Sequence, residues 1–193
     1  MEQSTSRKVI LSMQMTFDGF VAGPNNEMDW LINGDEEWAL IFEDLQSVDT
    51  MLVGGNMYPE YFSFWQSMLD DKSAPVNLAK YAELASRTPH IIFSKTLQKA
   101  DWPNIRIARD VSSEIASLKQ QAGKDIIVWG GATFAGDLIN KGLIDEYRIT
   151  LNPTILGGGK ALFKDVKNRR RLQLIDARPL PSGIIVLRYK AWK

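Results

Sequence analysis

DIIVWGGATFAGDLI (residues 125–139) predicts a buried strand, a sharp turn at Gly130–Gly131 and a helix directly after the turn. A glycine pair lets the backbone turn tightly and lets a ligand approach with no Cβ in the way. The first turn of the helix offers unpaired N–H groups and the positive end of the helix dipole. This order is typical of a phosphate site at the carboxyl end of a strand. We therefore expect a nucleotide at GGAT (residues 130–133); the alternative is a tight turn that binds nothing.

Two other segments place similar residues after a strand. Gly54, Gly55, Asn56 and Met57 repeat the order of strand end, glycines and helix start. In a parallel sheet two such turns can face one crevice, as the two phosphates of a dinucleotide require; a plain turn is the alternative. SKT (residues 94–96) follows another strand and could bind a ribose phosphate, or could be a solvated loop.

Alternating strands and helices occupy the first two thirds of the chain, and strands alone occupy its end. This pattern predicts an α/β sandwich with a mainly parallel sheet and antiparallel strands at one edge. We expect one domain, residues 1–193, with residues 1–7 flexible. The expected strands are 9–17, 20–23, 50–53, 91–93, 105–108, 126–129, 147–151, 172–177 and 184–189. The expected helices begin near residues 35, 58, 112 or 113, and 131, whereas residues 75–86 are expected to be irregular or a short helix.

The composition excludes several classes of protein. Lys+Arg and Asp+Glu both number 23, so the basic excess usual in nucleic-acid proteins is missing. No apolar run approaches the roughly 20 residues of a membrane span, and the first residues do not resemble a signal peptide. There is no cysteine and one histidine, His90, so thiolate or His-rich metal sites are excluded, a Ser-His-Asp triad is not expected, and His90 is taken as structural. We expect a cytoplasmic protein whose partner is a small-molecule substrate.

Acidic residues and a glycine-rich loop are further candidates. Asp35 and Glu37, at the start of a predicted helix, could assist proton transfer, although acids there more often only suit the helix dipole. GGGK (residues 157–160) could wrap a substrate or a phosphate, or could be a flexible hairpin loop. A basic cluster at residues 164–171 reads as a solvated face or as a handle for a phosphorylated substrate.

Several segments together resemble one known superfamily. They are MTFDGFVAG (15–23), LVG (52–54) with Tyr58, SKT (94–96), VWGG (128–131), the stretch 145–153, and GGG (157–159) with LF (162–163). The chain resembles the dihydrofolate-reductase-like superfamily, and more closely the C-terminal reductase domain of the bifunctional riboflavin-biosynthesis deaminase-reductase. The resemblance covers about residues 9–189. It implies a three-layer α/β sandwich with a mixed, mostly parallel sheet, and hydride transfer from NADPH.

The resemblance also implies where the cofactor lies. The pyrophosphate would lie on the strand–glycine–helix element, and the second glycine turn would follow the cofactor. The adenosine ribose and its 2′-phosphate would lie near the third segment, and the nicotinamide between the first strand and its following loop. In the same order, the implied residues are Gly130, Gly131, Ala132, Thr133 and Phe134; Gly54, Gly55, Asn56 and Met57; Ser94 and Lys95; and Met13, Gln14, Val21 and Ala22.

Two departures from the family pattern bear on the function. The family often carries an arginine after the glycine of the second turn, facing the 2′-phosphate; Gly55 and Asn56 stand here, so NADH is not excluded. Dihydrofolate reductases carry an acid on the first helix that hydrogen-bonds the pterin ring. In this chain that place falls at or beside Trp38, whose indole cannot replace a carboxylate, so folate is disfavoured as the substrate. The expected substrate is a small heterocycle or a sugar-linked pyrimidine, and the rival hypothesis is a binding module without turnover. A homodimer, as is common in the family, could form along an edge strand such as residues 184–189.

Overall fold

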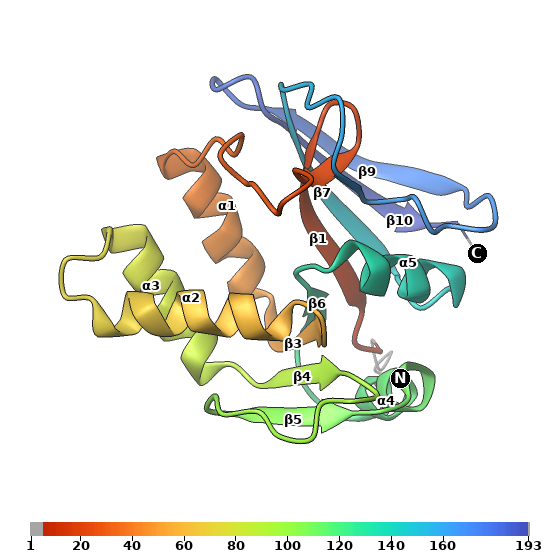
Figure 1. The fold of residues 1–193 in the computed structure, drawn as a ribbon. Helices are drawn as coiled ribbons and strands as arrows, with labels where there is room; N and C mark the ends of the chain where they lie inside the picture. Colours follow the sequence, from red (N-terminus) through yellow and green to blue (C-terminus); the bar gives the residue numbers. More distant parts are fainter. Residues whose placement is uncertain (1–5, 193) are drawn as a thin grey trace.

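An eight-stranded sheet runs through the molecule in the order β5-β4-β3-β6-β1-β7-β10-β9 (Figure 1) in a computed structural model that describes residues 6–192. The first six strands in this order run parallel, and β10 and β9 are antiparallel to their neighbours, as the sequence predicted. A small second sheet pairs β2 with β8. The strands are β1 Val9–Thr16, β2 Phe20–Ala22, β3 Val48–Gly54, β4 His90–Phe93, β5 Ile105–Ala108, β6 Asp125–Val128, β7 Glu146–Asn152, β8 Lys160–Ala161, β9 Leu172–Pro179 and β10 Ile185–Ala191.

In the described part of the chain, five helices cover the two faces of this sheet, which makes three layers (Figure 1). One face packs against α4 and α5, and the other against α1, α2 and α3. The helices are α1 Asp35–Gln46, α2 Tyr58–Asp70, α3 Val76–Arg87, α4 Val111–Gln120 and α5 Ala132–Asn140. Within residues 6–192, none of these helices has the length and apolar character needed to cross a bilayer.

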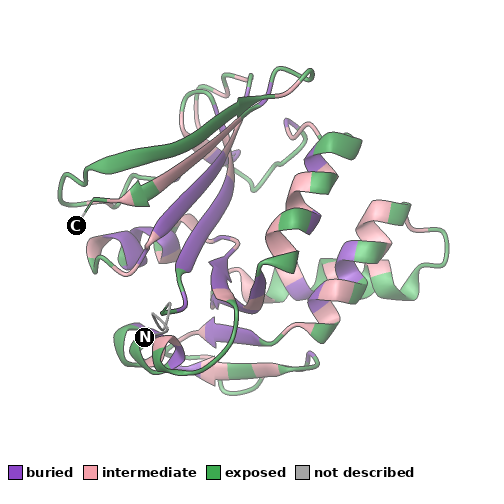
Figure 2. Cartoon of the chain, turned by 180° about the vertical axis from the view of Figure 1, so that it is seen from behind, coloured by how far each residue is buried: buried purple, intermediate pink, exposed green. Residues whose placement is uncertain are grey.

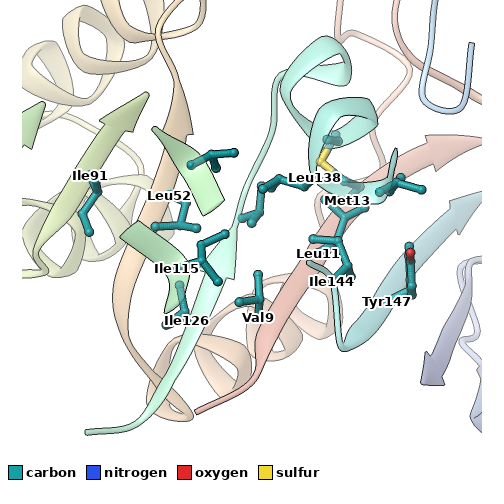
Figure 3. Close-up of a cluster of buried hydrophobic side chains, with 14 of the residues drawn as sticks. Val9, Leu11, Met13, Leu52, Ile91, Ile115, Ile126, Leu138, Ile144 and Tyr147 are labelled. Atoms are coloured by element: carbon teal, nitrogen blue, oxygen red, sulfur yellow. The ribbon is translucent and has the colours of Figure 1, made fainter. Parts of the chain in front are cut away.

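The main core lies between the central strands and the α4–α5 layer. Side chains alternate along β1, so Val9, Leu11 and Met13 point to this side and Ile10 to the other. Figure 3 shows the first three among side chains from β6 and from helices α4 and α5. The central strands are buried on both faces, whereas β9 is exposed along its whole length (Figure 2).

Two helix predictions need correction. Residues 75–86 are helical, the second of the two alternatives, but the helix is not short: Val76–Arg87 has twelve residues and buries Tyr81, Ala82 and Ala85. The polar residues Asn77, Lys80, Glu83 and Ser86 interrupt the apolar ones and make this helical spacing weak in the sequence. Helix α4 begins at Val111, before either of the expected serine caps, because the Asp110 carboxylate accepts the Ser113 N–H at 2.8 Å.

Two further expectations concern the edges of the structure. Of the residues expected to be flexible, 1–5 lie outside the described part, whereas Arg7 is 5% exposed and donates to the Thr50 hydroxyl at 2.8 Å. Residues 184–189 do not form an edge strand, because β10 lies between β7 and β9. The edge is β9, so pairing of two copies at this end of the sheet would run along β9.

An ion network fastens α1 to β7 and β10. Arg148 donates to Asp44 of α1 and, at 2.7 Å, to Glu146, which also accepts from Arg188 at 2.9 Å and from Lys8 at 3.0 Å. Burial alone would raise the pKa of Glu146, but the hydrogen bonds from these three cations outweigh it and lower the pKa to about 2. Burial raises the pKa of Asp44 in spite of Arg148. The network therefore adds paired charges to the apolar contacts of Phe42 and Leu45 that join α1 to its neighbours.

His90, the single histidine, makes the fold sensitive to pH. It is 1% exposed, its Nδ1–H donates to the Thr88 carbonyl at 2.7 Å, and its ring packs edge-on against Phe62. Burial lowers its pKa from 6.5 to about 4. The unfolded chain therefore binds a proton between pH 6.5 and 4 that the folded chain does not, so the stabilisation is complete above pH 6.5 and is lost as the pH falls.

We predict that the free energy of unfolding falls by about 2 kcal/mol from pH 7 to pH 5 because of His90. Urea unfolding at both pH values measures this. His90→Gln retains an N–H donor and cannot titrate, so the fall should be smaller by that amount. An equal fall in both proteins would contradict the assignment.

Candidate functional site

The two glycine turns lie side by side at the carboxyl ends of neighbouring parallel strands, β3 and β6, in which Leu52 pairs with Val128. A Cβ added to Gly54 would lie 2.8 Å from Cβ of Phe134 on α5. A Cβ added to Gly130 would lie 2.9 Å from Sδ of Met57, in the other turn. The turns therefore touch, and a larger residue at either glycine would push them apart.

The start of α5 suits an anion. Gly131 is its N-cap with φ +82°, a conformation that a residue with a side chain rarely adopts. No side chain caps the helix, and the first intrahelical bond runs from the Ala135 N–H to the Gly131 carbonyl at 2.8 Å. The amides of Ala132, Thr133 and Phe134 thus have no helical acceptor, which fits a diphosphate.

The expectation that a missing Cβ leaves room for a ligand is wrong at Gly130. The space beside its Cα is taken by the thioether of Met57, and Sδ of Met13 lies 3.9 Å away. The glycine is required there by the contact between the turns. Room for a bound group is therefore expected at the α5 amides, not beside Gly130.

The third predicted segment joins the same edge of the sheet. The Gly55 N–H donates to the Phe93 carbonyl at 2.9 Å, and a Cβ on Gly55 would lie 2.6 Å from Cβ of Ser94. The Ser94 hydroxyl oxygen accepts the backbone N–H of Leu97 at 3.0 Å. Lys95, like Asn56 of the second turn, is exposed.

Arg109 is a residue that sequence reasoning missed. It follows β5, whose Ala108 pairs with Phe93, and its guanidinium donates to the Ser94 carbonyl. Within residues 6–192, neither Lys95 nor Arg109 forms an ion pair with a carboxylate. Two positive charges therefore follow adjacent strands, beside the second glycine turn.

The residues expected around a nicotinamide lie on β1 and β2. Met13 and Val21 share the main core, Val21 and Ala22 are buried, and Gln14 is half-buried. Sequence reasoning missed Asn152, which is fully buried and donates to Oε1 of Gln14 at 3.3 Å. Its Oδ1 accepts the Ile32 N–H at 3.2 Å, so this one side chain links β1 to the connection before α1.

The two acidic candidates have different surroundings. Glu37 is 4% exposed and accepts a hydrogen bond from the Ser182 hydroxyl at 2.6 Å. Asp35 is exposed at the first position of α1. Trp38 faces Phe42, with ring centroids 5.7 Å apart. Glu37 is thus an enclosed carboxylate, and its described hydrogen bond joins it to Ser182 and not to the glycine turns.

Two surface hollows of the described chain are not lined by Gly54, Gly55, Gly130 or Gly131. One, of about 330 Å³, lies between the starts of α1 and α3 and is lined by Trp38 and Val76 among others. The other, of about 200 Å³, lies beside α2 and includes Tyr58 and Trp102. No cluster of three His, Cys, Asp or Glu side chains suited to a metal occurs in the described part of the chain. The glycine turns remain the better candidate site, because the unpaired amides at the start of α5 suit a diphosphate.

Known proteins are similar to this chain in sequence. The RibD C-terminal domain family matches residues 7–186. YyaP, an uncharacterized protein of Bacillus subtilis (strain 168), is 34% identical over 183 residues, which cover 95% of this chain and 94% of YyaP.

Solved structures agree on the fold. A protein of Shewanella sp. PV-4, whose name assigns it provisionally to riboflavin biosynthesis, has a TM-score of 0.75 at 20% identity, covering 96% of this chain and 99% of that one. The diaminohydroxyphosphoribosylaminopyrimidine deaminase/5-amino-6-(5-phosphoribosylamino)uracil reductase of Thermotoga maritima has a TM-score of 0.68 at 15% identity, covering 97% and 57%. Dihydrofolate reductase from Enterococcus faecalis, complexed with NADP(H), has a TM-score of 0.61 at 12% identity, covering 96% and 97%. This chain therefore has the dihydrofolate-reductase-like fold and belongs to the RibD C-terminal domain family.

Proposed function

We propose that this protein is an NADPH-dependent reductase that transfers a hydride to a small heterocyclic or sugar-linked substrate. The phosphoribosylaminouracil named for the Thermotoga maritima protein is an example of this class. The observation that carries the proposal is the contact of two glycine turns beside the uncapped start of α5. Family membership supports a reductase.

In this proposal the chain binds and orients the cofactor, which supplies the hydride when bound. The α5 amides hold the diphosphate, and the turn at Gly54 lines the cofactor on the neighbouring strand. Met13, Gln14 and the β2 residues flank the nicotinamide and exclude water from it. Because the cofactor supplies the hydride, the reaction needs no nucleophile or metal from the protein.

We predict that NADPH at about 100 times its dissociation constant stabilises the protein by roughly 2.7 kcal/mol, visible as a rise in melting temperature. Gly131→Val should abolish the rise, because a β-branched residue at φ +82° distorts the start of α5. Gly142→Val is the matched control: Gly142 has φ +68° beyond the other end of α5, so the variant bears a similar backbone penalty away from the turn.

Each melting temperature is compared with that of the same variant without nucleotide. The control should lose stability and keep the NADPH-dependent rise. A wild-type protein that neither NADPH nor NADH stabilises would refute the proposal, and an unchanged rise in Gly131→Val would show that the diphosphate lies elsewhere. Oxidation of bound NADPH by candidate substrates, followed by absorbance, then separates a reductase from a binding module.

The preference for NADPH is proposed to come from Lys95 and Arg109. Both cations lie beside Ser94 and lack a carboxylate partner in the described chain, so they are available to a 2′-phosphate. They would replace the arginine that the family often places after the first glycine of the second turn. A charge-assisted hydrogen bond contributes about 1.5–3 kcal/mol.

We predict that Arg109→Ala and Lys95→Ala each weaken NADPH binding about tenfold or more and leave NADH binding unchanged. Lys99→Ala is the control: this exposed lysine is in the same connection but pairs with Asp101. Fluorescence titration with both nucleotides measures the dissociation constants. Equal losses for NADPH and NADH, or no loss, would assign the 2′-phosphate to other residues.

A further inference from the structure

One exposed carboxylate fastens the glycine-rich loop to the turn that follows β1. The Asp18 side chain accepts the backbone N–H of Gly157 at 2.7 Å, the N–H of Leu156 at 3.1 Å, and the Thr16 hydroxyl at 2.7 Å. These donors, the Thr16 hydroxyl first and then the two amides, hold the pKa of Asp18 below its usual value. The loop at residues 156–160 is therefore anchored at its start and is not a freely flexible hairpin.

The end of the same loop is in direct contact with β2. β8 pairs with β2, and the Leu162 N–H donates to the Gly19 carbonyl at 3.0 Å. A Cβ added to Gly159 would lie only 2.2 Å from the Ala22 carbonyl oxygen, and its φ is +140°. Gly158, one residue earlier, has nothing within 4 Å of such a Cβ. Only glycine at position 159 allows the two backbones to approach this closely.

The loop contacts β2, the strand whose residues Val21 and Ala22 are expected to border the nicotinamide. Val21 and Ala22 are 9% and 8% exposed, and Val21 belongs to the same core as Met13. The loop thus contacts the backbone of β2, while the Val21 side chain packs in the core. Releasing the loop would leave this three-residue strand without its pairing partner, because β2 and β8 form a sheet of only two strands.

We propose that Asp18 and Gly159 are positioning residues that fix β2, and thereby the fit of the nicotinamide half of the cofactor. This inference rests on the proposed function. It predicts an effect confined to one half of the nucleotide, because the loop contacts β2 and the adenosine half is assigned to Lys95, Arg109 and α5. A pre-formed wall costs no ordering on binding, whereas a loosened one does.

The test compares NADPH with 2′,5′-ADP, which carries the adenosine and its 2′-phosphate but no nicotinamide. Asp18→Ala and Gly159→Ala should each weaken NADPH binding about tenfold and leave 2′,5′-ADP binding unchanged. Asp18→Asn keeps one acceptor oxygen and should restore part of the affinity. Titration calorimetry on the full chain measures all dissociation constants.

Two matched controls should bind both probes like the wild type. Gly158→Ala changes the same loop where a Cβ meets open space. Asp71→Ala removes an exposed aspartate that likewise accepts a backbone N–H, that of Ser73, but in the connection between α2 and α3. Circular dichroism checks that each variant is folded, and two independent variants, Asp18→Asn and Gly159→Ala, test the idea if Asp18→Ala does not fold.

The outcomes separate the two claims. If the wild type binds neither probe nor NADH, the proposed function is wrong and this inference falls with it. If the wild type binds both probes and the Asp18 and Gly159 variants weaken both equally, or weaken neither, the positioning role is refuted while the proposed function stands. Weakening by Gly158→Ala as large as by Gly159→Ala would also refute it.

Discussion

The contact between two backbone turns, at Gly54 and at Gly130, is the constraint on which the candidate site depends. Gly54 lies against Phe134 of α5, and Gly130 lies against Met57 of the other turn. Because neither glycine has a side chain, the ends of β3 and β6 come together and α5 starts directly above them. The open amides of α5 and the cations that follow β4 and β5 then lie at one edge of the sheet.

The period of the side chains and the turn residues allowed the central part of the fold to be predicted. Val9–Thr16 alternates strictly enough to specify a strand, and the glycine pairs specify where two other strands end. Both signals are local, because backbone conformation and strand period depend on neighbouring residues. The same local logic placed the antiparallel strands at the end of the chain, but not their order in the sheet, which depends on contacts between distant segments.

Several contacts of the site could not be predicted from the sequence, because they join residues that lie far apart in the chain. Arg109 reaches Ser94 only because β4 and β5 are neighbours, and Asn152 reaches Gln14 only because β1 and β7 are. Asp18 stands in the sequence only as part of the MTFDGFVAG segment, although two of its donors, the amides of Leu156 and Gly157, lie 138 and 139 positions later. Hydrogen bonds of such long sequence separation leave no local pattern, so they emerge only once the sheet order is known.

The most direct test of the account is an electron-density map of crystals soaked with NADPH. We expect a diphosphate at hydrogen-bond distance, about 2.9 Å, from the backbone amides of the first turn of α5, with the nicotinamide beside Met13 and β2. A nucleotide bound at another part of the surface, or a diphosphate that does not contact α5, would contradict it.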